Sequence, residues 1–129
     1  MGQAMKKQIL IIDDDAAIRE MFVVVLGDAG YGVDTASTGE EGLVLKQKNK
    51  YDLLFLDFKM PGINGVETLQ QIRKKDKKIP VYIITSFYGP QFDEIVKSNE
   101  GKLRFELLKK PIDPKTVVTL ARNILEKAV

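Results

Sequence analysis

Five short apolar runs alternate with longer segments in which apolar residues recur at helical spacing, and this alternation restricts the fold more than any other feature. The runs are typical of buried strands and cover residues 8–12, 33–36, 53–56, 80–85 and 105–108. Strands that alternate with helices form βα units around a parallel sheet, and the helices cover both of its faces. The sequence therefore predicts a doubly wound α/β fold, and the whole chain, residues 1–129, has the usual length of a single domain.

Helix start signals precede several of the helical segments. Thr38 and Glu41 have the spacing of a capping box, and Asp113 followed by Pro114 is a typical start for the last helix. Asp15, the third of three consecutive acids, is better explained as the cap of the first helix than as a metal ligand. The segment after the fourth run has few apolar positions and predicts only a short, weak helix over residues 92–96.

Composition excludes several classes of chemistry and location. The chain has no cysteine and no histidine, so any reaction must use carboxylates, hydroxyls, lysines and backbone groups. The net charge of +2 is small, and we interpret the basic run at residues 73–78 as a solvated helix end, so no nucleic acid partner is expected. No apolar run approaches the roughly 20 residues that span a bilayer, and the N-terminus lacks a signal peptide. We therefore expect a cytoplasmic protein.

Polar residues follow four of the five predicted strands. The first run is followed by the acids at 13–15, the third by Asp57, the fourth by Thr85 and Ser86, and the fifth by Lys109 and Lys110. In a parallel sheet the carboxyl ends of the strands face one crevice, so these groups should converge there.

Carboxylates gathered in one crevice repel each other unless a cation compensates them. Oxygen ligands without histidine or cysteine favour a hard cation, and a site with few carboxylates and room for a phosphate suits Mg²⁺ better than Ca²⁺. A carboxylate beside Mg²⁺ and opposite a lysine can attack phosphorus and form an acyl phosphate. In such a site the metal holds one phosphoryl oxygen and Lys110 a second, while the Thr85 hydroxyl and backbone N–H groups after Asp57 hold the third.

Four motifs of the chain resemble, in order and at similar spacing, those of the receiver domain of bacterial two-component response regulators. They are "ILIIDDDAAIRE", "DLLFLDFKMPGINGVE", "IPVYIITS" and "LLKKPID", and the likeness covers nearly the whole chain. The resemblance implies a flavodoxin-like (βα)5 fold with the strand order 2-1-3-4-5. It also implies a cis peptide bond between Lys110 and Pro111.

The resemblance assigns a role to each candidate site residue. Asp57 is the phosphoacceptor, Thr85 the switch hydroxyl, and Lys110 the contact of the phosphoryl group.

For the metal, the resemblance implies Mg²⁺ bound by the carboxylates of Asp13, Asp14 and Asp57. The main-chain carbonyl of Lys59 would be a further ligand, whatever the side chain at that position.

The resemblance also implies a phosphorelay function rather than turnover of a separate substrate. A histidine kinase or histidine phosphotransfer protein donates the phosphoryl group, and the aspartyl phosphate changes partner affinity through the fourth helix, fifth strand and fifth helix. No output domain follows the last helix, which favours a single-domain regulator over a receiver cut from a longer protein. We expect a monomer or a weak, phosphorylation-dependent dimer that binds a downstream target or a missing output domain, without direct contact to nucleic acid or membrane.

The chain departs from the family pattern near its output surface. Receivers commonly place an aromatic residue three positions before the active-site lysine, and here that position is Leu107. Phe105, two residues earlier, should share its face of the sheet but lie farther from the crevice. The segment between Thr85 and Lys110 is also about three residues longer than usual in such motifs, so the coupling of threonine to an aromatic side chain is in doubt.

Three other functions fit parts of the pattern. A phosphatase of the haloacid dehalogenase type would place a second acid two residues after its nucleophile, where this chain has Lys59. A flavodoxin-like cofactor protein would need a loop rich in hydroxyls and glycines after the first strand, where this chain is acidic. A degenerate receiver that binds partners without phosphorylation would not need the acids, which are intact here.

Overall fold

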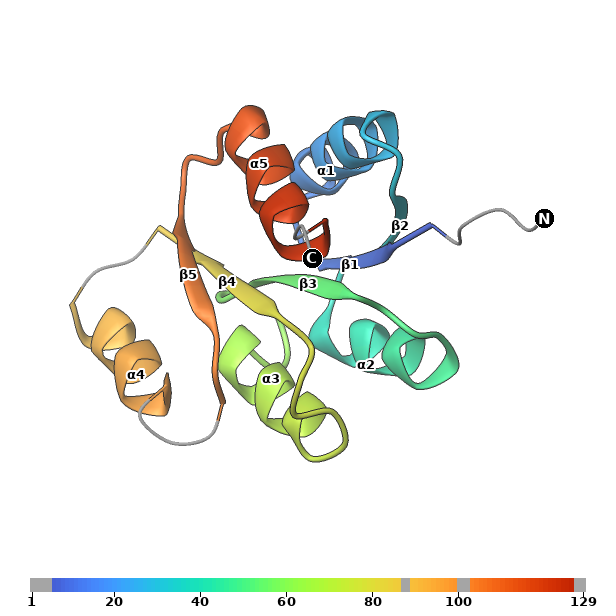
Figure 1. The fold of residues 1–129 in the computed structure, drawn as a ribbon. Helices are drawn as coiled ribbons and strands as arrows, with labels where there is room; N and C mark the ends of the chain where they lie inside the picture. The colour runs from blue at the N-terminus through green and yellow to red at the C-terminus, as the bar shows by residue number, and fades with distance from the viewer. Residues whose placement is uncertain (1–5, 87–88, 100–102, 127–129) are drawn as a thin grey trace.

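The computed structural model describes residues 6–86, 89–99 and 103–126 (Figure 1). Five strands and five helices alternate along this part of the chain. In chain order they are β1 (Gln8–Ile12), α1 (Ala16–Asp28), β2 (Gly32–Ala36), α2 (Gly39–Lys48), β3 (Leu53–Asp57), α3 (Gly65–Arg73), β4 (Val81–Thr85), α4 (Pro90–Asn99), β5 (Glu106–Lys109) and α5 (Pro114–Leu125). No helix among the described residues is both long enough and apolar enough to cross a membrane.

The five strands form one parallel sheet in the order β2-β1-β3-β4-β5. Figure 1 shows α1 and α5 on one face of this sheet, with α2, α3 and α4 on the other. The predicted doubly wound fold is therefore confirmed, together with the strand order that the resemblance implied. The direction of winding reverses between β1 and β3, and a ligand crevice of a doubly wound sheet forms beyond the carboxyl ends of the strands at such a point.

Two hydrophobic layers hold the helices on the sheet, because successive strand residues point to opposite faces. Leu10 and Leu54 pack beneath α2, α3 and α4, whereas Ile11 and Phe55 pack beneath α1 and α5. In the second layer, the ring centroids of Phe22 and Phe55 lie 4.9 Å apart. All five residues of β3 are buried, so the strand gives its last residue a rigid support.

Side-chain caps begin the helices at the places that the sequence predicted. The Asp15 carboxylate accepts hydrogen bonds from the Ala17 and Ile18 N–H groups at the start of α1. The Thr38 hydroxyl accepts from the Glu41 N–H, and Asp113 caps α5 ahead of a proline in its first turn.

The fourth helix is longer than the sequence predicted, which is a larger difference than the one-residue shifts at the strand ends. It runs over Pro90–Asn99 instead of residues 92–96. Proline is compatible with the first turn of a helix, because the N–H groups of that turn make no hydrogen bond within the helix. Pro90 is therefore the first residue of α4. Ile95 is fully buried in the layer above β4 and β5, and this burial anchors a helix of weak intrinsic signal.

The interpretation of residues 73–78 as a solvated helix end is wrong for its first residue. Arg73 is only 7% exposed. Its Nε atom donates a hydrogen bond of 2.5 Å to the Leu103 carbonyl oxygen, and its Nη2 atom donates one of 2.5 Å to the Arg104 carbonyl oxygen. The Nη1 atom donates a hydrogen bond of 3.2 Å to the Asp76 carbonyl oxygen. These bonds join the end of α3 to the start of β5, which explains why a guanidinium is buried there.

Asp76 joins the loop after α3 to α2. Its Oδ2 atom lies 2.9 Å from the Lys46 ammonium, and its Oδ1 atom accepts from the N–H groups of Lys78 and Ile79 at 2.9 and 3.0 Å. Burial alone would raise the pKa of Asp76, but the hydrogen bond from Lys46 and the two N–H donors outweigh burial and lower the pKa to about 2.

We expect Asp76→Asn to lower the free energy of unfolding at pH 7 by about 1 to 2 kcal/mol. Because the folded-state pKa is depressed, this stabilisation is complete above the ordinary value of 3.8 and disappears as the pH falls through about 2. Urea unfolding should therefore show a smaller effect of the variant at pH 3 than at pH 7. Glu20→Gln, which neutralises an exposed carboxylate on α1, is the control; an Asp76→Asn effect of equal size at both pH values would contradict the prediction.

Candidate functional site

A polar cavity of about 430 Å³ lies beyond the carboxyl ends of the strands. It is lined by Asp14, Asp15, Asp57, Lys59, Thr85, Ser86 and Lys110. These residues come from the segments that follow β1, from the ends of β3 and β4, and from the segment after β5. The structure thus brings together, at one edge of the sheet, the residues that the sequence placed at four strand ends.

Asp57 is the last residue of β3 and is 3% exposed. The Lys110 Nζ atom lies 3.1 Å from Asp57 Oδ1. The neighbouring backbone fixes both residues, since Phe58 N–H donates to the Ile84 carbonyl over 2.9 Å and Lys110 N–H donates to the Thr85 carbonyl over 3.0 Å. The backbone that carries these two side chains is therefore held against β4.

Three carboxylates cluster at the cavity, two of them in its lining and the third, Asp13, buried behind it. Asp13, Asp14 and Asp57 each offer one oxygen atom, and these atoms all lie within 4.8 Å of one another. Asp13 is fully buried, whereas Asp14 is exposed. Asp13 Oδ1 accepts from the Asp15 N–H over 2.9 Å, but the buried Oδ2 atom has no hydrogen-bond partner among the described residues.

Burial raises the pKa of Asp13. Burial and the nearby Asp13 charge also raise the pKa of Asp57 to about 7, although Lys110 acts in the opposite direction. One lysine therefore does not compensate the acidic cluster in full.

The residues fit a hard divalent cation. All the donors offered are oxygen atoms, and the buried Oδ2 atom of Asp13 needs a positively charged or hydrogen-bonding partner. Asp13, Asp14 and Asp57 would hold Mg²⁺, with room beside them for waters and a phosphoryl group. The assignment of the Lys59 carbonyl as a further ligand stays a prediction.

Thr85 and Lys110 also line the cavity. Thr85 ends β4 and is 2% exposed. Burial alone would lower the pKa of Lys110, but the charges of Asp57, Asp13 and Asp14 together raise it. Lys110 therefore carries its charge at neutral pH, and the bond between Lys110 and Pro111 is cis, as the resemblance implied.

The model of the response regulator receiver domain matches residues 9–122 of the chain. The chain belongs to the response regulator receiver family. It is 32% identical over 128 residues to the transcriptional regulatory protein ResD of Bacillus subtilis, and the aligned part is 99% of this chain and 52% of ResD. It is also 36% identical over 123 residues to the probable transcriptional regulator ycf29 of Porphyra purpurea, and the aligned part is 94% of this chain and 57% of that protein. The receiver thus spans about half the length of these curated relatives.

Solved receiver structures have the same fold. The chemotaxis protein CheY4 of Vibrio cholerae superposes with a TM-score of 0.84 at 30% identity and covers 94% of this receiver and 100% of CheY4. A CheY-like receiver domain protein from Methanospirillum hungatei gives a TM-score of 0.86 at 26% identity, covering 95% and 96% of the two chains. Receiver domains are signalling domains of two-component systems that generally bind Mg²⁺ at an acidic pocket, and the acids of this chain form a pocket of that kind.

Sequence reasoning missed one residue of the receiver site. The Arg19 Nη1 atom donates to the main-chain carbonyl of Asp13 over 2.8 Å and so holds the loop that carries the acids. The available signal was an arginine at the fourth position of α1, within reach of the loop before the helix. Sequence gave no reason to prefer this contact over a solvated side chain.

The aromatic position of the receiver has the arrangement that the sequence predicted. Leu107 pairs with Ile83 in the sheet and is half-buried, while Phe105 is 6% exposed. Both pack in the layer beneath α2, α3 and α4, so they share a face of the sheet. The ring of Phe105 therefore lies in the core two residues upstream of the position at which receivers commonly carry an aromatic switch.

The first residue of α3, Gly65, lies very close to the receiver site. A Cβ atom at this position would lie 2.6 Å from the Asp57 carbonyl oxygen and 3.0 Å from Phe58 Cα. The Gly65 N–H also donates to the Phe58 carbonyl over 2.8 Å. Because these neighbours are backbone atoms, a side chain would displace the strand end that carries Asp57.

We expect Gly65→Ala to lower the free energy of unfolding by about 1 to 3 kcal/mol, because overpacking against backbone forces it to shift. Gly27→Ala is the matched control. A Cβ atom on Gly27, in α1, meets no atom within 4 Å, so alanine there should stabilise the helix by about 1 kcal/mol. Urea unfolding of the two variants should give opposite signs, and equal stability changes would contradict the close approach at Gly65.

Proposed function

We propose that this receiver accepts a phosphoryl group on Asp57 from a histidine kinase or histidine phosphotransfer protein and thereby switches its affinity for a partner. The observation that supports the proposal most directly is the placement of Asp57. Its carboxylate is almost fully buried, within 3.1 Å of the Lys110 ammonium and beside two further acids that fit Mg²⁺.

In the proposed reaction an Asp57 carboxylate oxygen attacks the phosphorus atom of the donor. A bond forms between this oxygen and phosphorus while the bond from phosphorus to the donor nitrogen breaks, and the electron pair of that bond stays with the nitrogen. Lys110, which pairs with Asp57 Oδ1 at the start, moves its ammonium to a phosphoryl oxygen. The Thr85 hydroxyl donates to another phosphoryl oxygen.

Mg²⁺, when bound, supplies positive charge that compensates the acids and the incoming phosphoryl group. Arg19 keeps the Asp13 carbonyl, and with it the acidic loop, in place. The rigid end of β3 keeps the nucleophile from turning away from the cavity. These residues position the reactants, and phosphoryl transfer depends mainly on such positioning and on charge compensation. The domain catalyses only its own phosphorylation and dephosphorylation under this proposal, without turnover of a separate substrate.

Intact mass measurement tests the chemistry. After incubation with acetyl phosphate, the protein should gain one phosphoryl group when Mg²⁺ is present and none when Mg²⁺ is removed with a chelator. Peptide mapping should place the group on the segment that contains Asp57. A protein that stays unmodified under all conditions would leave a receiver that binds its partners without phosphorylation.

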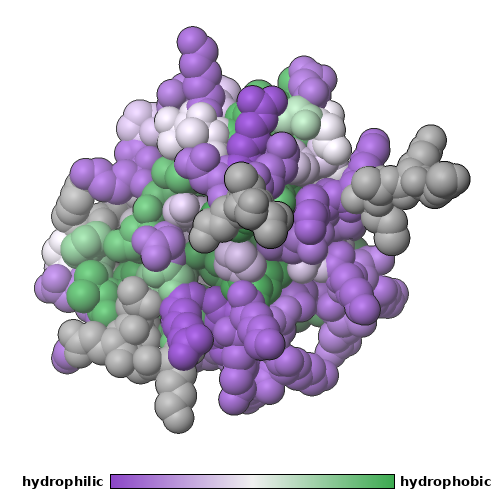
Figure 2. All heavy atoms as spheres, viewed as in Figure 1, coloured by the Kyte–Doolittle hydropathy of each residue, from purple (hydrophilic) through white to green (hydrophobic). Residues whose placement is uncertain are grey.

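The output surface under this proposal consists of α4, β5 and α5. Thr85 pairs with Lys109 in the sheet, so a shift of the Thr85 hydroxyl toward the phosphoryl group acts directly beside β5. Val96 on α4 is 42% exposed, and Leu107 on β5 is half-buried. Figure 2 shows hydrophobic side chains at the surface on the side where α4 and β5 lie. A surface of this kind suits a protein partner, whose affinity phosphorylation would change by shifting the population of two conformations.

The partners follow from the same proposal. A kinase or phosphotransfer protein supplies the phosphoryl group, and a downstream protein or an output domain of the kind carried by the transcriptional regulators among the relatives receives the signal. We propose a cytoplasmic location, no direct contact of this domain with nucleic acid or membrane, and a monomer that dimerises weakly on phosphorylation.

A further inference from the structure

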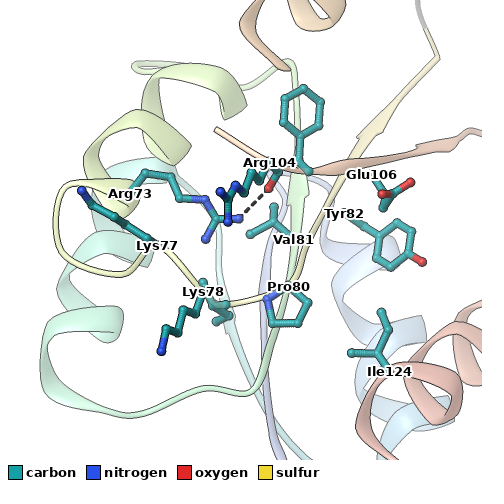
Figure 3. A pocket seen from close by; sticks show the side chains of 11 residues that line it. Arg73, Lys77, Lys78, Pro80, Val81, Tyr82, Arg104, Glu106 and Ile124 are labelled. Carbon is teal, nitrogen blue, oxygen red and sulfur yellow. Dashed lines mark hydrogen bonds between the residues drawn. The ribbon is translucent and has the colours of Figure 1, made fainter. Parts of the chain in front are cut away.

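A second hollow lies at the opposite end of the sheet from Asp57. It is a groove of about 820 Å³ at the amino ends of β4 and β5. Figure 3 shows Arg73, Lys77 and Lys78 on one side of the groove, Tyr82 and Glu106 on the other, and Pro80 and Val81 between them. The receiver chemistry does not use any of these residues.

The lining of this groove is strongly basic. Arg73, Lys77, Lys78 and Arg104 contribute four positive charges, and Glu106 contributes one negative charge. The whole chain has a net charge of only +2, so this groove concentrates more positive charge than the molecule carries on balance. A concave surface of one sign focuses the electrostatic field and raises the local concentration of ions of the opposite sign.

Two guanidinium groups form the centre of the basic lining. Arg73 is buried, and its donors reach main-chain carbonyl oxygens rather than a carboxylate. Burial lowers the pKa of Arg73, and the nearby charge of Arg104 lowers it further, although Asp76 acts in the opposite direction. Within the ranges that the structure describes, no salt bridge joins either arginine to an acid. Two like charges without an acidic partner favour an anion beside them, and Arg104 is the exposed one of the two.

The backbone of Arg104 has an unusual conformation. Its φ angle is +50°, in the left-handed region that non-glycine residues seldom adopt. The Arg73 Nη2 atom donates to the carbonyl oxygen of Arg104 over 2.5 Å and so holds the strained residue. Strain of this kind persists where surrounding contacts fix it, and it is common at ligand sites.

The far side of the groove offers a flat wall, the Tyr82 ring, with the Glu106 carboxylate beside it. Tyr82 is half-buried, and its ring stacks on Phe55 with 5.7 Å between centroids and 16° between planes. This stacking keeps the Tyr82 ring in a fixed position beside Pro80. A rigid ring next to a basic cluster suits a ligand that has an anionic part and a flat part.

We propose that this groove binds a small phosphorylated anion, with the phosphate oxygens on Arg104 and Lys77 and the rest of the ligand toward Pro80 and Tyr82. Guanidinium groups present a planar fork that matches phosphate oxygens, which favours phosphate over a single carboxylate. The groove also has the volume of a small-molecule site. Because it lies at the opposite end of the strands, this anion is distinct from the phosphoryl group proposed for Asp57.

Titration with inorganic pyrophosphate and with ADP, followed by amide chemical shifts at physiological ionic strength, tests the proposal. A chelator keeps divalent cations from the acidic cavity, where the carboxylates then repel both ligands. We expect saturable shifts at residues 78, 79, 81 and 82 and at 104–106, without matching shifts around Asp57. Tighter binding of ADP would assign the flat part to the Tyr82 wall, whereas equal affinities would show that phosphate alone is recognised.

Matched double variants distinguish a specific anion site from nonspecific electrostatic attraction to the basic surface. Lys77→Gln with Arg104→Gln should weaken binding roughly tenfold or more, because two charge-assisted contacts are lost. Lys74→Gln with Lys75→Gln removes the same charge from the same basic run outside the groove lining and should change the affinity little. Equal weakening by both double variants would overturn the proposal, as would the lack of saturable binding by the wild type.

A single variant guards against loss of folding as an explanation. Glycine adopts a φ of +50° without strain, so Arg104→Gly should fold at least as stably as the wild type. It should nevertheless bind pyrophosphate more weakly. Unchanged affinity in this stable variant would overturn the role of Arg104 and the proposed site with it.

Discussion

Asp57→Asn is expected to abolish the phosphoryl adduct completely, while the variant keeps its fold. Asparagine has the shape of aspartate and retains an oxygen that can accept from Lys110, whose Nζ atom lies 3.1 Å from Asp57 Oδ1 in the wild type. Its amide is not a nucleophile toward phosphorus. The measurement is intact mass after incubation with acetyl phosphate and Mg²⁺, with the unfolding midpoint as the check on folding.

Asp52→Asn is the matched control for this experiment. Asp52 lies just before β3, at the end of the strand opposite Asp57, and its carboxylate accepts from the Gln8 N–H over 2.8 Å. Asparagine can keep that hydrogen bond, and the change of charge is the same. This variant should be phosphorylated like the wild type. A phosphoryl adduct that survives in Asp57→Asn would move the acceptor to another residue, with Asp13 and Asp14 the nearest acids.

Strand positions and the convergence of the acids could be predicted from the sequence, because both depend on local rules. A buried parallel strand is a continuous apolar run, and strands that alternate with helices all end at the same edge of a sheet. The sequence alone therefore predicts that Asp13, Asp57, Thr85 and Lys110 lie together. Two features of the site cannot be read from sequence spacing. One is the ion pair of 3.1 Å between Lys110 and Asp57, and the other is the buried Oδ2 atom of Asp13, which has no hydrogen-bond partner among the described residues.

Long cationic side chains were the part that sequence patterns could not place. Arg73 ends α3 in a run of lysines, which is also what a solvated helix end looks like. Its burial depends on the carbonyl oxygens of Leu103 and Arg104, 30 and 31 residues farther along the chain. Arg19 reaches back to the Asp13 carbonyl in a comparable way. A contact between a flexible side chain and a backbone carbonyl leaves no periodic signal in the sequence.

A large effect on stability is also expected at Asp13, because its buried carboxylate destabilises the fold when no cation is bound. In the absence of a cation, Asp13→Asn should raise the free energy of unfolding by about 1 to 3 kcal/mol, because a buried charge next to Asp57 is removed. The remaining amide oxygen can still accept from the Asp15 N–H, as Asp13 Oδ1 does over 2.9 Å. The new amide N–H₂ also gives the buried Oδ2 position a donor toward the neighbouring carboxylate.

Saturating Mg²⁺ should remove most or all of this stability difference, and it should reverse the order where the difference is below about 2.7 kcal/mol. A ligand that binds only the folded state at about one hundred times its Kd stabilises it by about 2.7 kcal/mol, so the wild type gains that much and Asp13→Asn gains little. Urea unfolding with a chelator and with Mg²⁺ measures both effects. Asp15→Asn is the control, since asparagine also caps helices and Asp15 is not among the three clustered acids; it should respond to Mg²⁺ like the wild type. If Asp13→Asn gained as much from Mg²⁺ as the wild type does, Asp13 would not be a ligand, and its buried oxygen would need another partner.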